Sequence, residues 1–447
     1  MLSYINTVLL NLLDANIAVR WSIAARLWGI FSSILTIIFI YTHFTPDMQG
    51  YYYAFMSLLA TQMLADLGFN TVTLFYTRNE WAKLNQKEQI KDNHKEEANK
   101  NIIRIFKTVS TYYVIVATIL TLLLATLGTH FLGKQSENEV KWLLPWIALC
   151  PLVGLNILFS LSLTFLEGCN YLNSVYAARF YQAFINSCVI WITITLGGGL
   201  WSLPLGAFFG LLAGFIFCDR DGWKFINQKI NEVWRKPLPF IFAEMWPMQW
   251  RIAISSVSAY ATFSLAVPLA FNFLGPATAG QLGLSLSISF AVITISGSFL
   301  SPSAALFASH VSLKQYHELD KLFFKQIKIS FALSTLLVII VIALKIPLEN
   351  NFSNLTSRIL PNDQLIWLLS ASVCQSTVAP ILVYVRAHRE DPTFLFSAFF
   401  ALLIALFSYF YLGNNNVQGF TQAYFFLSLL CVPVWFYFWR YFRKIRH

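Results

Sequence analysis

Three stretches of this sequence contain no Asp, Glu, Lys or Arg at all: residues 180–218, 252–309 and 393–439. Each is longer than the ~20 apolar residues that one membrane-spanning helix needs. Each also contains turn residues near its middle, namely GGG at 197–199, LGPATAG at 274–280 and GNNN at 413–416. Each stretch therefore predicts two apolar helices joined by an uncharged turn.

The composition supports a membrane protein. The chain is 57% hydrophobic and 12% charged over 447 residues, which is more apolar surface than a soluble fold of this length could bury. The six cysteines lie in or beside apolar stretches without metal-ligand spacing, so neither a disulfide framework nor a metal site is expected. No cleavable signal is evident. The net charge of +10 is explained by the loops of a membrane protein, and nucleic acid is not an expected partner.

Hydropathy and helix breakers predict an all-α integral membrane protein with twelve spans. They lie near residues 21–42, 51–77, 104–130, 142–166, 173–196, 200–218, 246–271, 278–306, 327–345, 363–385, 393–412 and 418–439. This count leaves only Lys134, Lys141, Lys345 and Arg358 on the side opposite the termini. The positive-inside rule then places both termini in the cytoplasm of a multi-pass protein.

An internal repeat predicts two parallel lobes. Pro46 and Gly50 follow the first span just as Pro276 and Gly280 follow the seventh. Six helices return the chain to its starting side, so the halves are parallel repeats around a central cavity, as in a transporter. We expect an N-terminal lobe over 1–219, a cytoplasmic amphipathic connector over 220–245 and a C-terminal lobe over 246–447.

Six charged residues within or beside the spans are candidates for function, because a charge at the bilayer centre costs on the order of 2.5–3.5 kcal/mol. The cations Arg26, Arg251 and Arg179 are candidate substrate ligands, and the acids Asp66, Glu167 and Glu244 are candidates for ion coupling or pairing. Two simpler interpretations stay open. The arginines could snorkel to the headgroups, and Glu167 could pair with Arg179 across their short connection.

The signs of these charges favour an anionic ligand. The first and seventh spans carry arginine, whose planar fork grips phosphate oxygens through paired hydrogen bonds. Asp66 is the single acid in the middle of a span. The hydroxyl side chains of the eighth span lie on two opposite faces, one of which carries Ser285 and Ser289. These faces could pack against other helices or line a polar path. No catalytic motif is present, so we expect neither an enzyme nor a bound cofactor, and H⁺ or Na⁺ coupling stays open.

Several segments resemble bacterial polysaccharide exporters, the O-antigen-type flippases of the MATE-like multidrug/oligosaccharidyl-lipid/polysaccharide exporter superfamily. They are TPDMQGYYYAFMSLLATQMLADLGF (45–69), FLEGCNYLNSVYAAR (165–179), EMWPMQWRIAISSVSAY (244–260), AGQLGLSLSI (279–288) and YHELDKLFF (316–324). The resemblance covers both lobes and becomes weaker after about residue 330. It implies a twelve-helix, two-lobed fold with a cationic cavity, to which Arg26 and Arg251 contribute.

The resemblance also implies alternating access that moves a lipid-linked oligosaccharide, usually a glycan on polyprenyl diphosphate, to the outer leaflet of the bacterial inner membrane. The expected partners are this lipid-linked oligosaccharide, membrane lipids and polysaccharide polymerase machinery. Two alternatives remain, because a fold does not fix a function. One is a cation-coupled multidrug antiporter, in which Asp66 would be essential. The other is a membrane-embedded glycan polymerase or ligase, which the short outer loops argue against.

Overall fold

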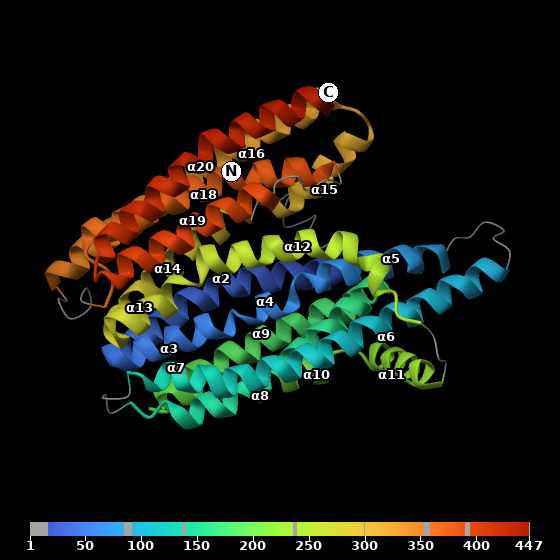
Figure 1. The fold of residues 1–447 in the computed structure, drawn as a ribbon, viewed down its shortest axis with the longest axis horizontal. Helices are drawn as coiled ribbons and strands as arrows, with labels where there is room; N and C mark the ends of the chain where they lie inside the picture. Colours follow the sequence, from blue (N-terminus) through green and yellow to red (C-terminus); the bar gives the residue numbers. More distant parts are fainter. Residues whose placement is uncertain are drawn as a thin grey trace. The chain divides into compact units, whose positions relative to one another are not determined.

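A computed structural model describes residues 17–84, 92–135, 140–235, 239–298, 300–351, 358–388 and 394–446. These residues are almost entirely helical, and no strand occurs among them (Figure 1). The helices are α2 (Ile17–His43), α3 (Pro46–Leu59), α4 (Gln62–Asp66), α5 (Phe69–Leu84), α6 (Asp92–Leu123), a π-helical turn (Leu124–Gly128), α7 (Thr129–Gly133), α8 (Leu143–Gly168), α9 (Leu172–Thr195), a 3₁₀ turn (Gly199–Trp201), α10 (Ser202–Phe217), α11 (Arg220–Arg235), α12 (Phe242–Phe263), α13 (Ala266–Leu274), α14 (Pro276–Gly297), α15 (Leu300–Ser312), α16 (Tyr316–Asn351), α18 (Asn362–Ala387), α19 (Phe394–Gly413) and α20 (Val417–Arg446).

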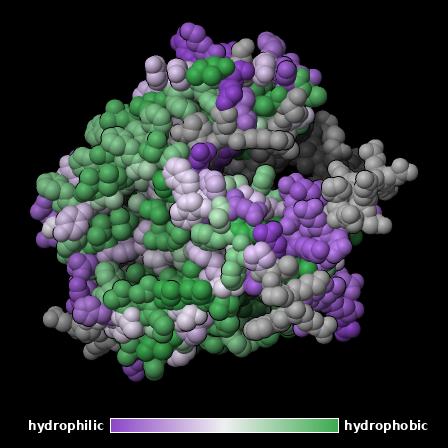
Figure 2. Space-filling model, turned by 45° about the vertical axis from the view of Figure 1, so that its right-hand side comes forward, coloured by the Kyte–Doolittle hydropathy of each residue, from purple (hydrophilic) through white to green (hydrophobic). Residues whose placement is uncertain are grey.

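The helices confirm an all-α, multi-pass membrane protein. Nine helices of the described chain are long and apolar enough to cross a membrane, or ten when α12 and α13, which bend by 42° at a short break, count as one span. The two other expected spans, 51–77 and 173–196, are not among these candidates. The first is interrupted, and α9, which forms the second, carries Arg179, Gln182 and Asn186. A count of twelve stays a prediction. On the face drawn in Figure 2, apolar side chains form broad areas between hydrophilic patches.

Several expected spans are broken helices. The span expected over 51–77 divides into α3, α4 and α5. Between α4 and α5, Leu67 and Gly68 have positive φ angles of 47° and 74°, a conformation that cannot continue a right-handed helix. The span expected over 278–306 likewise divides into α14 and α15. Hydropathy alone does not reveal these breaks, because the apolar pattern continues through them.

By contact, the chain divides into two compact units that are not contiguous. Unit 1 comprises Met1–His43, Gln62–Gly133 and Lys141–Ala253. Unit 2 comprises Phe44–Thr61, Lys134–Val140 and Ile254–His447. The boundaries expected at 219/220 and 245/246 are therefore not boundaries between these units. The predicted connector belongs to unit 1, and α12 is divided between the two units. The six-plus-six membrane topology is a separate matter and stays a prediction.

In unit 1, α9 packs along α2 and α10, and α8 packs against α5 and α6. The amphipathic helix α11 covers α6 and α8 with its apolar side, where Ile226 joins a buried cluster that includes Phe165 and Val175. In unit 2, α14 packs against α3, α13 and α18, while α18 also packs along α20. A second buried cluster lies there, in which Phe323 stacks on Trp439 at 4.5 Å between ring centroids.

A close helix contact within unit 2 joins the two segments of the sequence repeat. A Cβ atom added at Gly50 of α3 would lie 2.0 Å from the Pro276 carbonyl oxygen of α14. A Cβ added at Gly280 would lie 2.9 Å from the Gly50 backbone nitrogen. The buried Gln49 side chain donates a hydrogen bond of 3.0 Å to the Gly280 carbonyl. Small residues thus allow the two helix backbones to touch, as is common in membranes.

This contact predicts that Gly50→Ala destabilises the protein, because the added methyl group would overlap backbone atoms of α14 that cannot move independently. We expect a loss of about 1–3 kcal/mol or more, in the range of overpacked cores. The apparent melting temperature of the purified protein in detergent measures this loss. The matched control is Gly29→Ala in α2, where an added Cβ meets no atom within 4 Å. Equal melting temperatures for the two variants would contradict the close-packing argument.

Candidate functional site

Arg26 lies on an open face of α2. This helix packs on α9 through aromatic rings, such as Trp28, whose ring centroid is 4.6 Å from that of Phe184. Helical periodicity places Arg26, Gly29 and Ser33 together on another side of α2, and all three are exposed. Arg26 forms no ion pair with any described acidic residue. The guanidinium group is therefore available to a ligand.

Arg251 is also exposed, on the part of α12 that belongs to unit 1. Its guanidinium carbon lies 5.6 Å from the ring centroid of Trp250, which is a cation–π distance. Two residues before it, Gln249 is almost fully buried and donates a hydrogen bond of 2.6 Å to the Leu67 carbonyl at the α4–α5 break. Gln249 thus fixes this turn of α12 on unit 1, while Arg251 has no acidic partner among the described residues.

Arg179 differs from the other two arginines because it is paired. Its Nη1 atom lies 2.8 Å from Oε2 of the buried Glu167. The Tyr176 hydroxyl donates a hydrogen bond of 3.2 Å to Glu167 Oε1, and Nη2 of Arg78 lies 4.0 Å from the same oxygen. Two arginines from α9 and α5 therefore share one buried carboxylate. Of the two interpretations left open by the sequence, pairing describes Arg179.

Asp66 is hydrogen bonded at the break between α4 and α5. The Tyr113 hydroxyl of α6 donates to Asp66 Oδ1, and the backbone N–H groups of Gly68 and Asn70 also donate to this carboxylate. The neighbouring Tyr112 hydroxyl donates a hydrogen bond of 2.9 Å to the Ala65 carbonyl. Asp66 therefore holds the start of α5 against α6, which is a structural task that the sequence did not reveal.

Glu244 lies in the first turn of α12 and forms an ion pair near the surface. Its Oε1 atom lies 3.3 Å from Nη2 of Arg104 in α6, and its side chain is 61% exposed. The Tyr76 hydroxyl of α5 donates a hydrogen bond of 2.8 Å to the Glu244 carbonyl. Thus α12 is attached to α5 and α6 at its first turn.

The six candidate residues therefore fall into two groups, those with a partner of opposite charge or a hydrogen-bond donor and those without one. Each acid accepts a hydrogen bond or forms an ion pair with a described side chain, whereas two of the three cations have no acidic partner in the described chain. No group of three or more His, Cys, Asp or Glu residues that could hold a metal ion occurs among the described residues. Among the six candidate residues, the two without an acidic partner in the described chain are both arginines.

The hydroxyl faces of α14 also differ. Ser285, Ser289 and Ser296 are buried, and the Ser296 hydroxyl donates a hydrogen bond of 2.9 Å to Ser376 of α18. Thr294, on the other face, is exposed. The first face is thus a helix-packing surface. Of the two faces, only the second could line a polar path.

All six cysteines are free, as the sequence predicts. Burial raises the pKa of Cys169, which follows the end of α8, to about 12. Its thiol is therefore protonated at neutral pH and is a poor nucleophile.

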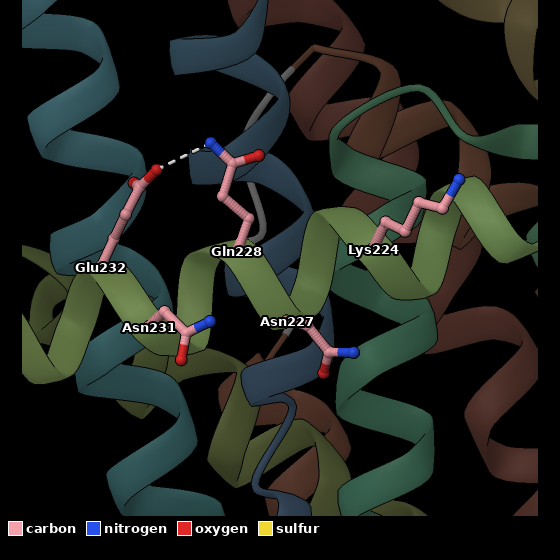
Figure 3. A pocket seen from close by; sticks show the side chains of 5 residues that line it. All are labelled: Lys224, Asn227, Gln228, Asn231 and Glu232. Atoms are coloured by element: carbon pink, nitrogen blue, oxygen red, sulfur yellow. Dashed lines mark hydrogen bonds between the residues drawn. The ribbon is translucent and has the colours of Figure 1, made fainter.

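A polar pocket of about 520 Å³ lies over α11, lined by Lys224, Asn227, Gln228, Asn231 and Glu232 (Figure 3). Gln228 donates a hydrogen bond of 3.0 Å to Glu232, and Asn227 and Asn231 point away from that pair in the same view. All five residues come from one helix. The opposite face of α11 holds the buried Lys229, whose Nζ atom donates to Asn99 of α6 at 2.9 Å.

The sequence did not identify Arg78, Arg104 or Gln249 as neighbours of the candidate residues. Arg78 and Arg104 lie at the ends of expected spans, and the glutamates with which they pair are distant in sequence. Gln249 carries no charge and lies in an apolar run. Its proximity to Arg251 is the one sequence signal that could have drawn attention to it.

The fold is that of the MATE-like transporters of the MOP superfamily. One solved structure, an inward-facing multidrug resistance MATE transporter, matches with a TM-score of 0.64 and 12% identity over 92% of this chain and 98% of that one. The lipid II flippase MurJ in an inward closed conformation matches with a TM-score of 0.66 and 13% identity over 94% of this chain and 87% of MurJ. A MOP superfamily transporter from Pyrococcus furiosus, whose binding pocket is described as of reversed polarity, matches with a TM-score of 0.58 and 13% identity over 97% of this chain and 98% of that one. No family model and no curated protein matches the sequence.

The pairing pattern predicts different costs for removing the two paired glutamates. Glu167→Gln leaves two arginines without their buried counter-charge, and we expect a loss of about 1–3 kcal/mol. Glu244→Gln removes a mostly exposed pair, with an expected loss below about 1 kcal/mol. Thermal unfolding of both purified variants in the same detergent measures the difference. A Glu244→Gln loss as large as that of Glu167→Gln would show that burial does not set the cost.

Proposed function

We propose that this protein is a flippase that moves a polyprenyl-diphosphate-linked oligosaccharide from the cytoplasmic to the outer leaflet of the bacterial inner membrane, for surface polysaccharide synthesis. Both termini lie in the cytoplasm. The protein works by alternating access and is not an enzyme. The observation that carries the proposal is that, of the six candidate charges, Arg26 and Arg251 alone are exposed without a partner of opposite charge in the described chain.

Arginine suits a diphosphate headgroup. Its guanidinium group donates two parallel hydrogen bonds to phosphate oxygens and remains charged at every physiological pH. Arg26 and Arg251 each bind one side of the headgroup in this proposal. Arg179 contributes less, because it would first have to leave Glu167, from which it is separated by 2.8 Å.

The fold agrees with the transport of a large amphiphile. MurJ, which shares this fold, is named as a lipid II flippase. In this proposal the oligosaccharide crosses through a polar interior while the polyprenyl chain remains in lipid. The helix breaks supply the bending points. These include the 42° bend between α12 and α13, close to Pro268, and the break before Pro302 in α15.

The multidrug MATE transporters with the same fold make a cation-coupled drug antiporter the main alternative. A site for a cationic drug needs an available carboxylate. Asp66, Glu167 and Glu244 all have hydrogen-bond or ion-pair partners. This pairing favours the anionic substrate.

Replacing either open arginine is expected to slow flipping strongly. The loss of one charge-assisted phosphate contact costs about 1.5–3 kcal/mol, which corresponds to roughly 10–100-fold in rate. Proteoliposomes containing undecaprenyl diphosphate linked to an oligosaccharide measure this rate, through the fraction of glycan that membrane-impermeant periodate oxidises. We expect Arg26→Ala and Arg251→Ala to reduce it to this extent, and Arg26→Lys to reduce it less.

The matched control is Arg220→Ala, an exposed arginine at the start of α11, which should flip at the normal rate. Normal flipping by both Arg26→Ala and Arg251→Ala, at equal protein content, would overturn the proposed headgroup contact. Drug sensitivity on deletion, with transport abolished by Asp66→Asn, would instead identify the antiporter. Altered glycan chain length with normal flipping would identify a polymerase.

A further inference from the structure

Two arginines of unit 1 lie at the two oxygens of a single carboxylate. Glu167 belongs to the last turn of α8, and its side chain is only 10% exposed. Arg179 of α9 places Nη1 at 2.8 Å from Glu167 Oε2, and Arg78 of α5 places Nη2 at 4.0 Å from Oε1. The Tyr176 hydroxyl of α9 also donates to Oε1. We call these four residues the arginine cluster.

Close backbone packing fixes the positions from which both arginines project. A Cβ atom added at Gly168 would lie 2.7 Å from the Thr77 Cβ and 3.5 Å from the backbone nitrogen of Arg78. Because Gly168 has no side chain, the end of α8 can approach α5 directly beside Arg78. On α9, Val175 and Ala178 are fully buried next to the polar residues of the cluster. The two guanidinium groups therefore extend from a rigid base formed by three helices.

The charges of the arginine cluster do not cancel. Each arginine is positive at every physiological pH, whereas the cluster contains one carboxylate. Arg78 and Arg179 form no ion pair with any other acidic residue of the described chain. The neighbouring Glu80 of α5 is already paired with Lys83. One positive charge is therefore left in excess.

Both guanidinium groups keep N–H donors for a further ligand. A guanidinium group has five N–H donors in a planar fork, and each arginine approaches Glu167 through one nitrogen. The side chain of Arg78 is 60% exposed and that of Arg179 is 37% exposed, so their remaining donors are accessible at the surface. Because the two groups are separated by no more than one carboxylate, a single phosphate group can contact both. Phosphate is the anion whose geometry the guanidinium fork matches best.

The arginine cluster lies where lipid headgroups are expected. Arg78 and Glu167 each directly follow an expected span, 51–77 or 142–166, and Arg179 lies near the start of α9. One turn before Arg78 on the same side of α5, the Phe75 ring is 58% exposed. An apolar ring thus borders the cationic groups on the side of the membrane-spanning segment. This arrangement fits an amphiphile with a charged phosphate and an apolar chain.

We propose that Arg78 and Arg179 bind the phosphate of an anionic membrane phospholipid such as phosphatidylglycerol, while Glu167 positions both guanidinium groups. The phosphodiester carries one negative charge, which matches the excess charge of the cluster, whereas a diphosphate carries more. Arg179 keeps its contact with Glu167, and an acyl chain packs on Phe75. This lipid site goes beyond the proposed flippase activity, because it needs neither an oligosaccharide nor the arginines assigned to the carrier headgroup.

Titration of the full-length protein in detergent with phosphatidylglycerol tests the proposal, with bound lipid counted by native mass spectrometry. We expect Arg78→Gln to weaken the apparent affinity for the first bound lipid about tenfold or more, because a charge-assisted phosphate contact is lost. This side chain is mostly exposed, so the variant should fold normally. The matched control is Arg220→Gln, which removes the same charge from an exposed position on α11 and should bind normally. An unchanged affinity in Arg78→Gln, or an equal loss in Arg220→Gln, overturns the proposal.

Two further titrations test the matching of charge and the source of the phosphate. Glu167→Gln raises the excess charge from one to two, and should shift the preference severalfold from phosphatidylglycerol toward phosphatidic acid, whose monoester phosphate carries more charge. An unchanged preference contradicts the charge match, and if this variant does not fold, Arg78→Gln decides alone.

Undecaprenyl diphosphate separates the two lipid sources. If Arg78→Gln weakens binding of this diphosphate and leaves phosphatidylglycerol binding unchanged, the carrier lipid is the ligand and the phospholipid assignment is wrong. Arg26→Ala should bind phosphatidylglycerol normally. Failure of the flippase proposal would therefore appear as absent flipping with intact phospholipid binding, and the two proposals can fail independently.

Discussion

A charge within an apolar helix bundle must either meet an opposite charge, accept hydrogen bonds or reach water. Unit 1 depends on this constraint. Its buried or half-buried acids are satisfied by partners from other helices, since Glu167 pairs with Arg179, and Asp66 accepts hydrogen bonds from Tyr113 and from backbone groups. These interactions fix α5, α6, α8 and α9 relative to one another. The exposed Arg26 and Arg251 satisfy the same constraint by reaching the surface, which makes them available to an anion.

The broken helices follow from a related constraint on the backbone. Each break frees N–H and C=O groups that need partners in an apolar environment. At the α4–α5 break, Asp66 accepts from backbone N–H groups and Gln249 donates to the freed Leu67 carbonyl. In unit 2, Gln49 donates to the Gly280 carbonyl beside the tight contact of α3 with α14. At the α4–α5 break, a charged and a neutral side chain thus stabilise irregular backbone, whereas Gln49 stabilises a close contact between two regular helices.

The sequence predicted the helical class, the positions of most spans and the free cysteines, because hydropathy and helix length depend on local composition. It also predicted the equivalence of Gly50 and Gly280, although not that the two residues touch. It could not predict the break at Leu67 and Gly68 or the inclusion of residues 44–61 in unit 2, since both arise from tertiary packing. The candidate charges were found from the sequence. Their partners Arg104 and Tyr113 were not, because these lie on a helix that is distant in the sequence.

The most direct test of the central claim, that the open guanidinium groups bind a negatively charged lipid headgroup, is an experimental structure with undecaprenyl-diphosphate-linked oligosaccharide bound. The account predicts diphosphate oxygens at about 2.7–2.9 Å from guanidinium nitrogens of Arg26 and Arg251. It is contradicted if the diphosphate binds elsewhere while both arginines contact only the headgroups of bulk lipids.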